Sequence, residues 1–400
     1  MLEIKEVKTR KEQKIFAALS TAMYGKVPQA IPDMISDEMN MFNPKKNPAF
    51  EYCRVKQFLA YRDGKCVGRI AGIINKAANE KWHTKRIRFS RVDFIDDPEV
   101  SAALFEAVMD WGRQEGLTEI HGPIGFSDMD QEGMLVEGFQ EEGIFITIYN
   151  HPYYVKHMEA MNFRKDTDWM EFQVKIPKEP NERMDMLSAA VLKKHKLRLI
   201  EPKSRRQIKP YITMIFDLYN ITYEKLYGTV RLSYQQIMKY YDQFILMINP
   251  KYLKILLDEN DQLVGVGLAM PSLNKAAKKS NGRLFPLGWY RLLRAPYAKS
   301  KVLDLYMIGV LPSMQNKGLT AILMNSMAVA ARENGFEIAE TGPELENNHQ
   351  VQAMWKHYEV RQHKRRRCWV RTIDEKHNQR NEGWNEDSRA VCKKTDRTVL

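Results

Sequence analysis

One stretch of the chain, residues 302–335, constrains the fold more than any other. Residues 302–310 (VLDLYMIGV) are rich in apolar and aromatic side chains and too few for a helix of useful length, so they predict a buried strand. From residue 319 the apolar side chains recur at helical spacing until Gly335, which predicts an amphipathic helix with a glycine stop. A strand therefore leads, across one short loop, into a helix.

The loop between these elements continues into the helix as residues 315–320 (QNKGLT). Gly318 lets the backbone approach a ligand closely, and the first amides of the helix have no partners within the helix. These amides, the helix dipole and the charge of Lys317 together favour a bound phosphate. The segment therefore predicts an anion site at the junction of strand and helix.

The order of strand, Q/R-x-x-G-x-G/A pattern and helix resembles the acyl-coenzyme A signature of the GNAT acyltransferase superfamily. Residues 315–320 fit the pattern except at Thr320, which replaces a small residue. Further along, residues 336–341 resemble the next parallel strand and residues 368–371 a closing strand. The resemblance implies acyl-CoA, acetyl or long-chain, as co-substrate. It assigns cofactor binding to Ile308, Val310, Gln315, Asn316, Lys317, Gly318, Leu319, Thr320 and Asn348.

Amide formation from an acyl thioester needs a deprotonated amine, donors for the thioester oxygen and an acid for the leaving thiolate. In the superfamily the oxygen and the pantetheine are held by the backbone of the central strand, here around residues 308–310, whose splay from the next strand opens a cleft. The usual acid is a tyrosine about seven residues after the asparagine of the following helix. From Asn348 this position is Trp355, which cannot donate as an acid. Tyr358, roughly on the same helical face, is the nearest substitute.

Candidates for the base flank the same cleft by their position in the sequence. Glu340 and Glu346 are the first candidates, and His349 or His357 are alternatives. Each has a structural explanation as well: Glu346 can cap the helix, and a lone histidine on a helix is more often structural than catalytic. We therefore take Tyr358, Glu346 and Glu340 as the catalytic candidates.

The order of elements repeats along the chain. Residues 66–71 are echoed by 263–268, and residues 113–123 by 332–343. With 400 residues, 44% of them hydrophobic, the chain is long enough for two cores. The predicted fold class is α/β (α+β), with two tandem GNAT-like domains, each a mixed central sheet flanked by helices. The predicted bounds are 1–178 for the first domain, 179–196 for a linker, 197–373 for the acyl-CoA-binding domain and 374–400 for a disordered tail.

The first copy differs where the second predicts the anion site. In place of the glycine loop it has residues 94–99 (FIDDPE), whose three carboxylates would repel a pyrophosphate. We therefore expect a degenerate copy that binds no cofactor. The same acidic residues would complement the dipole of the helix that follows.

A long glycine- and aromatic-bearing insert, residues 122–154, follows the fifth strand of the first copy. Its patterns GP-x-x-F/L-S, LV-x-GF and PYY resemble a group of bacterial tandem-GNAT proteins, one branch of which acts as acyl-CoA-dependent ceramide synthases. The resemblance covers about residues 20–370. It implies an N-acyltransferase that moves an acyl group, long-chain in this branch, to a lipid-like (sphingoid) amine. The alternative is a non-catalytic acyl-CoA-binding pseudo-acyltransferase that acts as sensor or scaffold, which the tryptophan at the acid position favours.

The net charge of +12 favours a phosphate-bearing partner, be it a cofactor, a nucleic acid or an anionic lipid. Residues 275–279 and 283–294 place lysines and arginines around a short aromatic and leucine-rich run. This pattern is typical of a contact with an anionic membrane surface or of an acyl-chain portal, and equally of a packed core helix with solvated arginines. Residues 364–367 (KRRR) lack an aromatic stacking platform, so we expect a solvated or cofactor-facing strand edge and no specific nucleic-acid partner.

The cysteines and the N-terminus bear on the compartment. Cys53, Cys66, Cys368 and Cys392 form no close pair and no C-x-x-C motif, which fits a reducing compartment and argues against a structural zinc site. Residues 1–6 carry charges where a signal peptide needs an apolar run. We expect a cytoplasmic protein, or one peripheral on the inner membrane, and the sequence leaves its oligomeric state open.

Overall fold

The computed structural model describes residues 1–373, and the predicted disordered tail lies outside them. The first copy of the repeat begins with a short strand and a helix whose N-terminus carries a capping box built by Thr9 and Glu12. Its elements are β1 (Leu2–Glu6), α1 (Arg10–Tyr24), α2 (Ile35–Met41), η1 (Pro48–Glu51), β2 (Cys53–Arg62), β3 (Lys65–Asn75), α3 (Lys76–Trp82), β4 (Arg86–Phe94), α4 (Pro98–Gln114), β5 (Glu119–Gly122), β6 (Met134–Glu137), α5 (Tyr153–Ala160) and β7 (Arg164–Lys175).

The second copy follows a similar order, with a pair of helices before its fourth strand where the first copy has the single helix α3. Its elements are α6 (Glu182–Lys194), β8 (Arg198–Ile200), α7 (Arg205–Ile208), η2 (Lys209–Tyr211), α8 (Ile212–Thr222), α9 (Tyr234–Phe244), η3 (Pro250–Tyr252), β9 (Leu253–Leu257), β10 (Leu263–Pro271), α10 (Asn274–Ser280), α11 (Gly288–Arg294), η4 (Ala295–Tyr297), β11 (Val302–Val310), η5 (Pro312–Met314), α12 (Leu319–Glu333), β12 (Ile338–Thr341), β13 (Glu344–Leu345), α13 (His349–Gln352), η6 (Ala353–His357) and β14 (Val360–Thr372). The predicted linker region holds α6, whose Asp185 accepts a hydrogen bond from Asn325 of α12.

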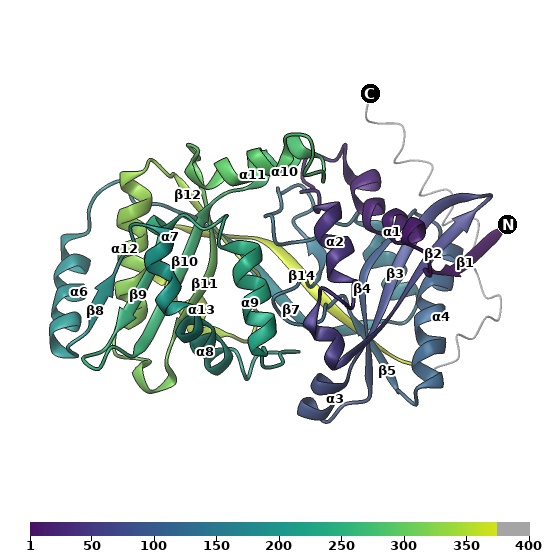
Figure 1. Cartoon of the computed structure of the whole chain (residues 1–400), viewed down its shortest axis with the longest axis horizontal. Helices are drawn as coiled ribbons and strands as arrows, with labels where there is room; N and C mark the ends of the chain where they lie inside the picture. Colours follow the sequence, from purple (N-terminus) through teal and green to yellow (C-terminus); the bar gives the residue numbers. More distant parts are fainter. Residues whose placement is uncertain (374–400) are drawn as a thin grey trace.

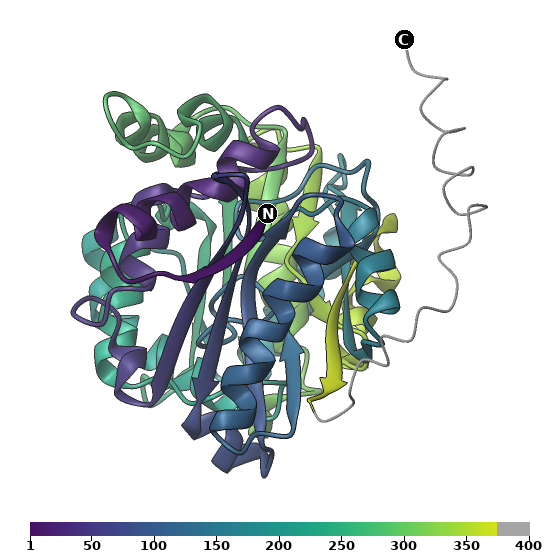
Figure 2. The same ribbon diagram turned by 90° about the vertical axis from the view of Figure 1, so that its right-hand side faces the viewer.

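The two copies share one mixed sheet flanked by helices, as predicted (Figure 1). Its strand order is β1-β2-β3-β4-β5-β14-β7-β12-β11-β10-β9-β8, and β6 and β13 pair with β14 and β7 at the side. Read from either end, this order passes through five strands of one copy and then reaches the long ribbon of β14 and β7 (Figure 2). The sheet therefore has an approximate two-fold arrangement about that ribbon.

The ribbon is made by an exchange of strands between the copies. Strand β14, the last of the second copy, pairs with β5 of the first, where Trp369 lies opposite Gly122. Strand β7, the last of the first copy, pairs with β12 of the second, where Val174 lies opposite Ala339. Each copy thus completes its sheet with the final strand of the other, so the sheet does not divide near residue 178. The domain bounds stay a prediction.

The helices that lead away from the two fourth strands bury the apolar stripes that the sequence predicts. On α12 the buried side chains include Leu319, Ile322, Leu323, Met327 and Ala331, which recur every three or four residues. Helix α4 packs against the first copy in the same way, through a cluster around Phe89 and Phe105. No helix within residues 1–373 has the length and apolar character required to cross a bilayer.

The prediction that residues 364–367 form a solvated or cofactor-facing strand edge is wrong. They lie inside β14, and Lys364 and Arg366 are each only 1% exposed. Both pair with the buried carboxylate of Glu171 on β7, and Arg367 on the other face pairs with Asp168. Burial alone would raise the pKa of Glu171, but the two cations lower it to about 2. The run of basic residues therefore balances acids on the neighbouring strand.

Candidate functional site

Strand β11 loses its partner on one side halfway along its length. It pairs in parallel with β12 only from Val302 to Leu305, because β12 ends at Thr341. Residues 307–310 then pair only with β10. Residues 305–308 are half-buried although the strand is central in the sheet. The pairing with β10 is shifted at Tyr306, a bulge of the kind that re-aims side chains next to active sites.

The loop after β11 presents free backbone donors. Asn316 and Gly318 have positive φ angles of 59° and 85°, and Gly318 is the N-cap of α12 with no side-chain cap. In the first copy, by contrast, Asp97 caps α4 and accepts hydrogen bonds from the amides of Glu99 and Val100. The anion-binding end of the helix is thus occupied by a carboxylate in the first copy and available in the second.

The remaining loop residues surround these donors. The Nε2 of Gln315 lies 3.5 Å from the carbonyl oxygen of Val310, and Lys317 is exposed. A Cβ built on Gly318 would lie 3.2 Å from the side chain of Val191, so α6 covers one side of the loop. Leu319, the first residue of α12, is buried, and Thr320 is half-buried.

The register of the two copies identifies a pair of equivalent backbone positions. Phe94 lies opposite Gly68 in the first copy, as Val310 lies opposite Gly265 in the second. In both copies the next residue donates its N–H to the neighbouring third strand, so Phe94 and Val310 turn their own N–H and C=O toward the side where pairing has ended.

The first copy fills this position with its own tyrosines. The N–H of Phe94 donates to the hydroxyl of Tyr154 at 2.9 Å, and the hydroxyl of Tyr153 donates to the carbonyl oxygen of Phe94 at 2.6 Å. Tyr154 is fully buried and also bonds the hydroxyl of Tyr24. The predicted insert therefore closes the unpaired edge of β4. Among the described residues, only the Gln315 amide reaches the equivalent Val310 carbonyl.

Two buried acids lie side by side just before the unpaired segment. Asp304 on β11 is directly opposite Glu340 on β12, and they are 0% and 7% exposed. Burial and the neighbouring Glu340 carboxylate raise the pKa of Asp304 to about 8. Neither Asp304 oxygen meets hydrogen-bond geometry with a described residue, although the nearby Ser272 hydroxyl opposes this rise in the pKa.

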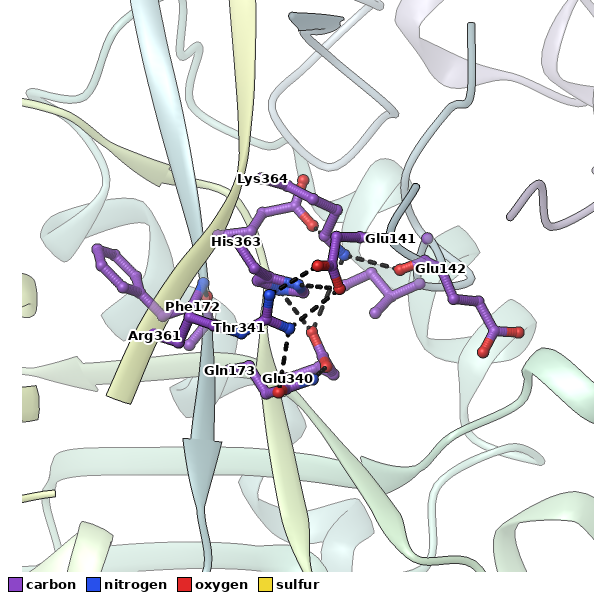
Figure 3. A network of polar contacts seen from close by, with 12 residues as sticks. Glu141, Glu142, Phe172, Gln173, Glu340, Thr341, Arg361, His363 and Lys364 are labelled. Atoms are coloured by element: carbon purple, nitrogen blue, oxygen red, sulfur yellow. Dashed lines mark hydrogen bonds and ion pairs between the residues drawn. The ribbon is translucent and has the colours of Figure 1, made fainter. Parts of the chain in front are cut away.

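Glu340 belongs to a network that joins both copies (Figure 3). Its carboxylate lies 2.8 Å from Nε2 of His363 on β14 and accepts a hydrogen bond from Gln173 on β7. The Nδ1 of His363 lies 3.3 Å from Glu141, which comes from the insert of the first copy. Lys364, 3.9 Å from Glu340, donates to the backbone oxygen of Glu142. The first copy thus supplies part of the surroundings of this predicted base.

A third acid, Glu344, is half-buried just past the end of β12. The indole N–H of Trp355 donates to its two oxygens at 3.1 and 3.2 Å. Burial raises the pKa of Glu344 to about 8. Nearby, the N–H of Gly342 donates to the carbonyl oxygen of Leu305, where the pairing of the two strands ends. The tryptophan at the usual acid position therefore contacts a carboxyl group that can hold a proton.

The other predicted catalytic residues lie in less suitable surroundings. Tyr358 is half-buried with its ring 6.4 Å from that of Trp355, and burial raises its pKa. Glu346 forms an ion pair with Lys165 at 2.7 Å, which gives this carboxylate a structural role. Asn348 caps α13 by accepting from the N–H of Val351. The alternatives His349 and His357 are exposed.

Sequence reasoning missed Asp304 and Glu344. The signal for Asp304 was available, because a carboxylate inside an otherwise apolar strand costs free energy unless it has a function or a partner. Glu344 follows a glycine and a proline, and no local pattern separates it from an ordinary loop residue. It contacts Trp355 in the folded protein, a contact that spacing does not reveal.

One group of side chains has the composition of a metal site. Ligand atoms of His121, Asp166 and Cys368 lie within 4.8 Å of one another. The hydroxyl of Tyr227, from the second copy, lies 2.9 Å from Nδ1 of His121 and 3.4 Å from Sγ of Cys368, and it donates to Asp166. Arg86 pairs with the same carboxylate. Hydrogen bonds therefore satisfy this group, which ties the second copy to three strands of the shared sheet.

Comparison with known proteins agrees with this geometry. Residues 212–358 match the Acetyltransferase (GNAT) family. Protein YghO of Escherichia coli (strain K12) is 27% identical over 290 residues, which are 71% of this chain and 72% of that protein. The bacterial ceramide synthase of Caulobacter vibrioides is 26% identical over 348 residues, which are 84% of this chain and 88% of that protein.

Solved structures show the same architecture. A tandem GNAT protein from the clavulanic acid biosynthesis pathway superposes with a TM-score of 0.53 over 93% of this chain and 99% of that chain, at 13% identity. At that identity the likeness concerns the fold. Together with the family match and the two relatives, it confirms the predicted tandem organisation.

Proposed function

Because residues 212–358 match the Acetyltransferase (GNAT) family and the fold resembles that of a tandem GNAT protein, we propose that the chain transfers an acyl group from acyl-CoA to an amine, with acyl-CoA held by the second copy. The observation that carries the proposal is the contrast between the copies. The first copy occupies its helix end with Asp97 and its strand edge with Tyr153 and Tyr154, whereas the second leaves both positions to a ligand.

The residues present fit the chemistry of the co-substrate, which supplies an activated acyl thioester. The free amides at the start of α12 and the charge of Lys317 suit a pyrophosphate. The backbone of Val310, turned toward the unpaired side, suits the amide groups of a pantetheine arm. The bulge at Tyr306 re-aims the strand backbone next to the two buried acids. Val310, Lys317 and the start of α12 are among the positions predicted for cofactor binding, and they remain a proposal.

Asp304 and Glu344 divide the proton transfers between them. Asp304, which lies beside Glu340, accepts a proton from the amine once the Asp304 carboxyl group is ionised. The fraction of enzyme molecules with an ionised Asp304 grows as the pH approaches 8, and the activity grows with it. Glu344, held by Trp355, keeps its proton at neutral pH and donates it to the leaving thiolate. We place Glu344 in the role first assigned to Tyr358.

The acyl donor proposed is long-chain and the acceptor a lipid-like amine of the sphingoid class. Support comes from the likeness to the bacterial ceramide synthase over 84% of this chain. An enzyme that prefers acetyl-CoA and small soluble amines would contradict this choice of substrates and leave the acyl transfer itself standing.

The test is a substitution at Gly318 with a matched control. Gly318→Asp places a carboxylate and a side chain at the helix start, so we expect binding of acetyl- and long-chain acyl-CoA to be lost in calorimetry. Gly335→Asp at the other end of α12 adds the same charge at a similar φ of 75°, and it should bind normally. Unchanged binding in Gly318→Asp would refute the placement of the site.

A second function is favoured by Trp355, which cannot act as an acid at its position. A catalytically silent protein that senses acyl-CoA would bind the ligand without turning it over. Release of free thiol across several amine classes separates the two. Binding with no release from any amine would support the sensor, and release that depends on Glu344 would exclude it.

A further inference from the structure

The helix pair α10–α11 displays an unusual set of apolar side chains. Phe285 is 78% exposed, Trp289 and Tyr290 are each 45% exposed, and Leu287 and Tyr297 are also exposed. These five gather in one segment between β10 and β11. Exposed aromatic residues grouped in this way mark contact surfaces more often than scattered ones do.

The same segment is strongly and uniformly basic. From residue 262 to residue 303 the sequence contains no aspartate or glutamate. Its basic residues are Lys275, Lys278, Lys279, Arg283, Arg291, Arg294, Lys299 and Lys301. Arg294 stacks over the ring of Tyr290 and donates to its hydroxyl at 2.9 Å, so charge and ring form one unit. Lys275, Lys279 and Arg283 are exposed.

The inner face of the helix pair holds it against the first copy. Its inner face, through Ala276, Ala277 and Leu292, packs on Ile31 and Met34 of the first copy. In Figures 1 and 2 the two helices lie at the periphery of the molecule, beside the first-copy helices α1 and α2. The aromatic side chains therefore form a surface beyond what the core requires.

Contacts connect this surface to the proposed site. Asn274 of α10 donates to the carbonyl oxygen of Gly143 at 2.8 Å, and Lys278 forms an ion pair with Glu142. The backbone oxygen of Glu142 accepts from the buried Lys364, which is part of the network around Glu340. The insert of the first copy thus contacts α10 on one side and the network on the other.

We propose that the outer face of α10–α11, formed by Phe285, Leu287, Trp289, Tyr290 and Tyr297 with its lysines and arginines, docks on an anionic lipid bilayer. This deepens and rests on the proposed function, because a membrane surface is where a lipid-like amine is found. Aromatic side chains enter the interface between headgroups and acyl chains, while the cations bind lipid phosphates. The segment itself contributes no acid that would oppose that attraction.

The test is co-sedimentation of the full-length protein with vesicles of phosphatidylcholine, with and without phosphatidylglycerol. We expect binding only to the anionic vesicles, and weaker binding at high salt. Phe285→Ser with Trp289→Ser should reduce binding at least tenfold. Lys275→Gln with Lys279→Gln should reduce it about fivefold per charge. The control Tyr234→Ser with Leu246→Ser removes equally exposed apolar side chains on and just after α9 and should bind as the parent does.

Three results would overturn the proposal: no binding to either vesicle, equal loss in the control, or a dimer in solution that the Phe285 and Trp289 changes dissolve. Failure of the proposed function would look different. Gly318→Asp should lose acyl-CoA and still bind anionic vesicles. The Phe285 and Trp289 variant should lose vesicles and still transfer acyl groups to a water-soluble amine.

Discussion

Asp304 places an ionisable group where water is excluded, and this ties the stability of the protein to pH. Its pKa of about 8 lies above its ordinary value of 3.8, so the folded state holds the proton more tightly than the unfolded chain. The contribution of Asp304 to the free energy of unfolding is complete below pH 3.8 and is lost as the pH rises toward 8. It changes by about 1.4 kcal/mol for each pH unit in between.

We therefore expect Asp304→Asn to remove this pH dependence. The free energy of unfolding, from urea titrations between pH 5 and pH 8, should fall less steeply in the variant than in the parent. The asparagine cannot accept a proton, so the turnover number should fall by roughly 10²-fold or more. Parallel stability profiles would show that Asp304 is already ionised in the folded protein.

Glu344 gives the second prediction at this scale. Glu344→Gln should lower the turnover number about 10²-fold while leaving acyl-CoA binding unchanged. It should also remove the decline in activity above pH 8 that deprotonation of this acid causes. Tyr358→Phe serves as the comparison, because the sequence alone points to that residue. A larger loss in Tyr358→Phe than in Glu344→Gln would return the acid role to the tyrosine.

Among the elements, the insert of the first copy seals its strand edge with two hydroxyl groups. Tyr154→Phe leaves the buried N–H of Phe94 and the hydroxyl of Tyr24 without their partner. An unsatisfied buried donor costs about 1–3 kcal/mol, which should appear as reduced stability in urea titrations. The control Tyr149→Phe removes only a weak bond of 3.4 Å and should cost less. Acyl-CoA binding should be normal in both, since the co-substrate site is proposed in the other copy.

The elements of the fold could be predicted from the sequence wherever local patterns decide them. The strand at 302–310 and the apolar stripe of α12 match their predictions because burial on one face imposes a period on the side chains. The charged run 364–367 could not be assigned, since its partners Glu171 and Asp168 lie on β7, far away in the sequence. Local composition predicts that such a strand is solvated, although the strand lies at the centre of the sheet.

The candidate site divides along the same line. Loop residues 315–320 are adjacent in the chain, so one motif places them all. The surroundings of Glu340 come from β7, β12, β14 and the first-copy insert, and only the folded sheet brings them together. Spacing in the sequence therefore points to the loop and to one acid, Glu340. It also points to Tyr358 as the proton donor, because the contact between Trp355 and Glu344 forms only in the folded protein.

For the whole molecule, the exchange of β7 and β14 makes the two copies depend on each other. We expect one cooperative unfolding transition, observed together by circular dichroism and by tryptophan fluorescence, despite the internal repeat. Residues 1–178 expressed alone would leave β5 without β14, and residues 179–400 would leave β12 without β7. Neither fragment should unfold cooperatively, and the two should co-purify when expressed together. Two separate transitions in the intact protein would contradict this.

The strand exchange also bears on how the protein is made. On the ribosome, β5 is complete at Gly122, but the strand that covers its edge begins only at Val360. At about 5–20 residues per second, the first copy waits on the order of ten seconds or more for its last strand. During that time the nascent chain carries an open strand edge, a template for pairing with neighbouring chains. Slow synthesis of the second half would therefore favour aggregation, and a chaperone that shields this edge would raise the yield of folded protein.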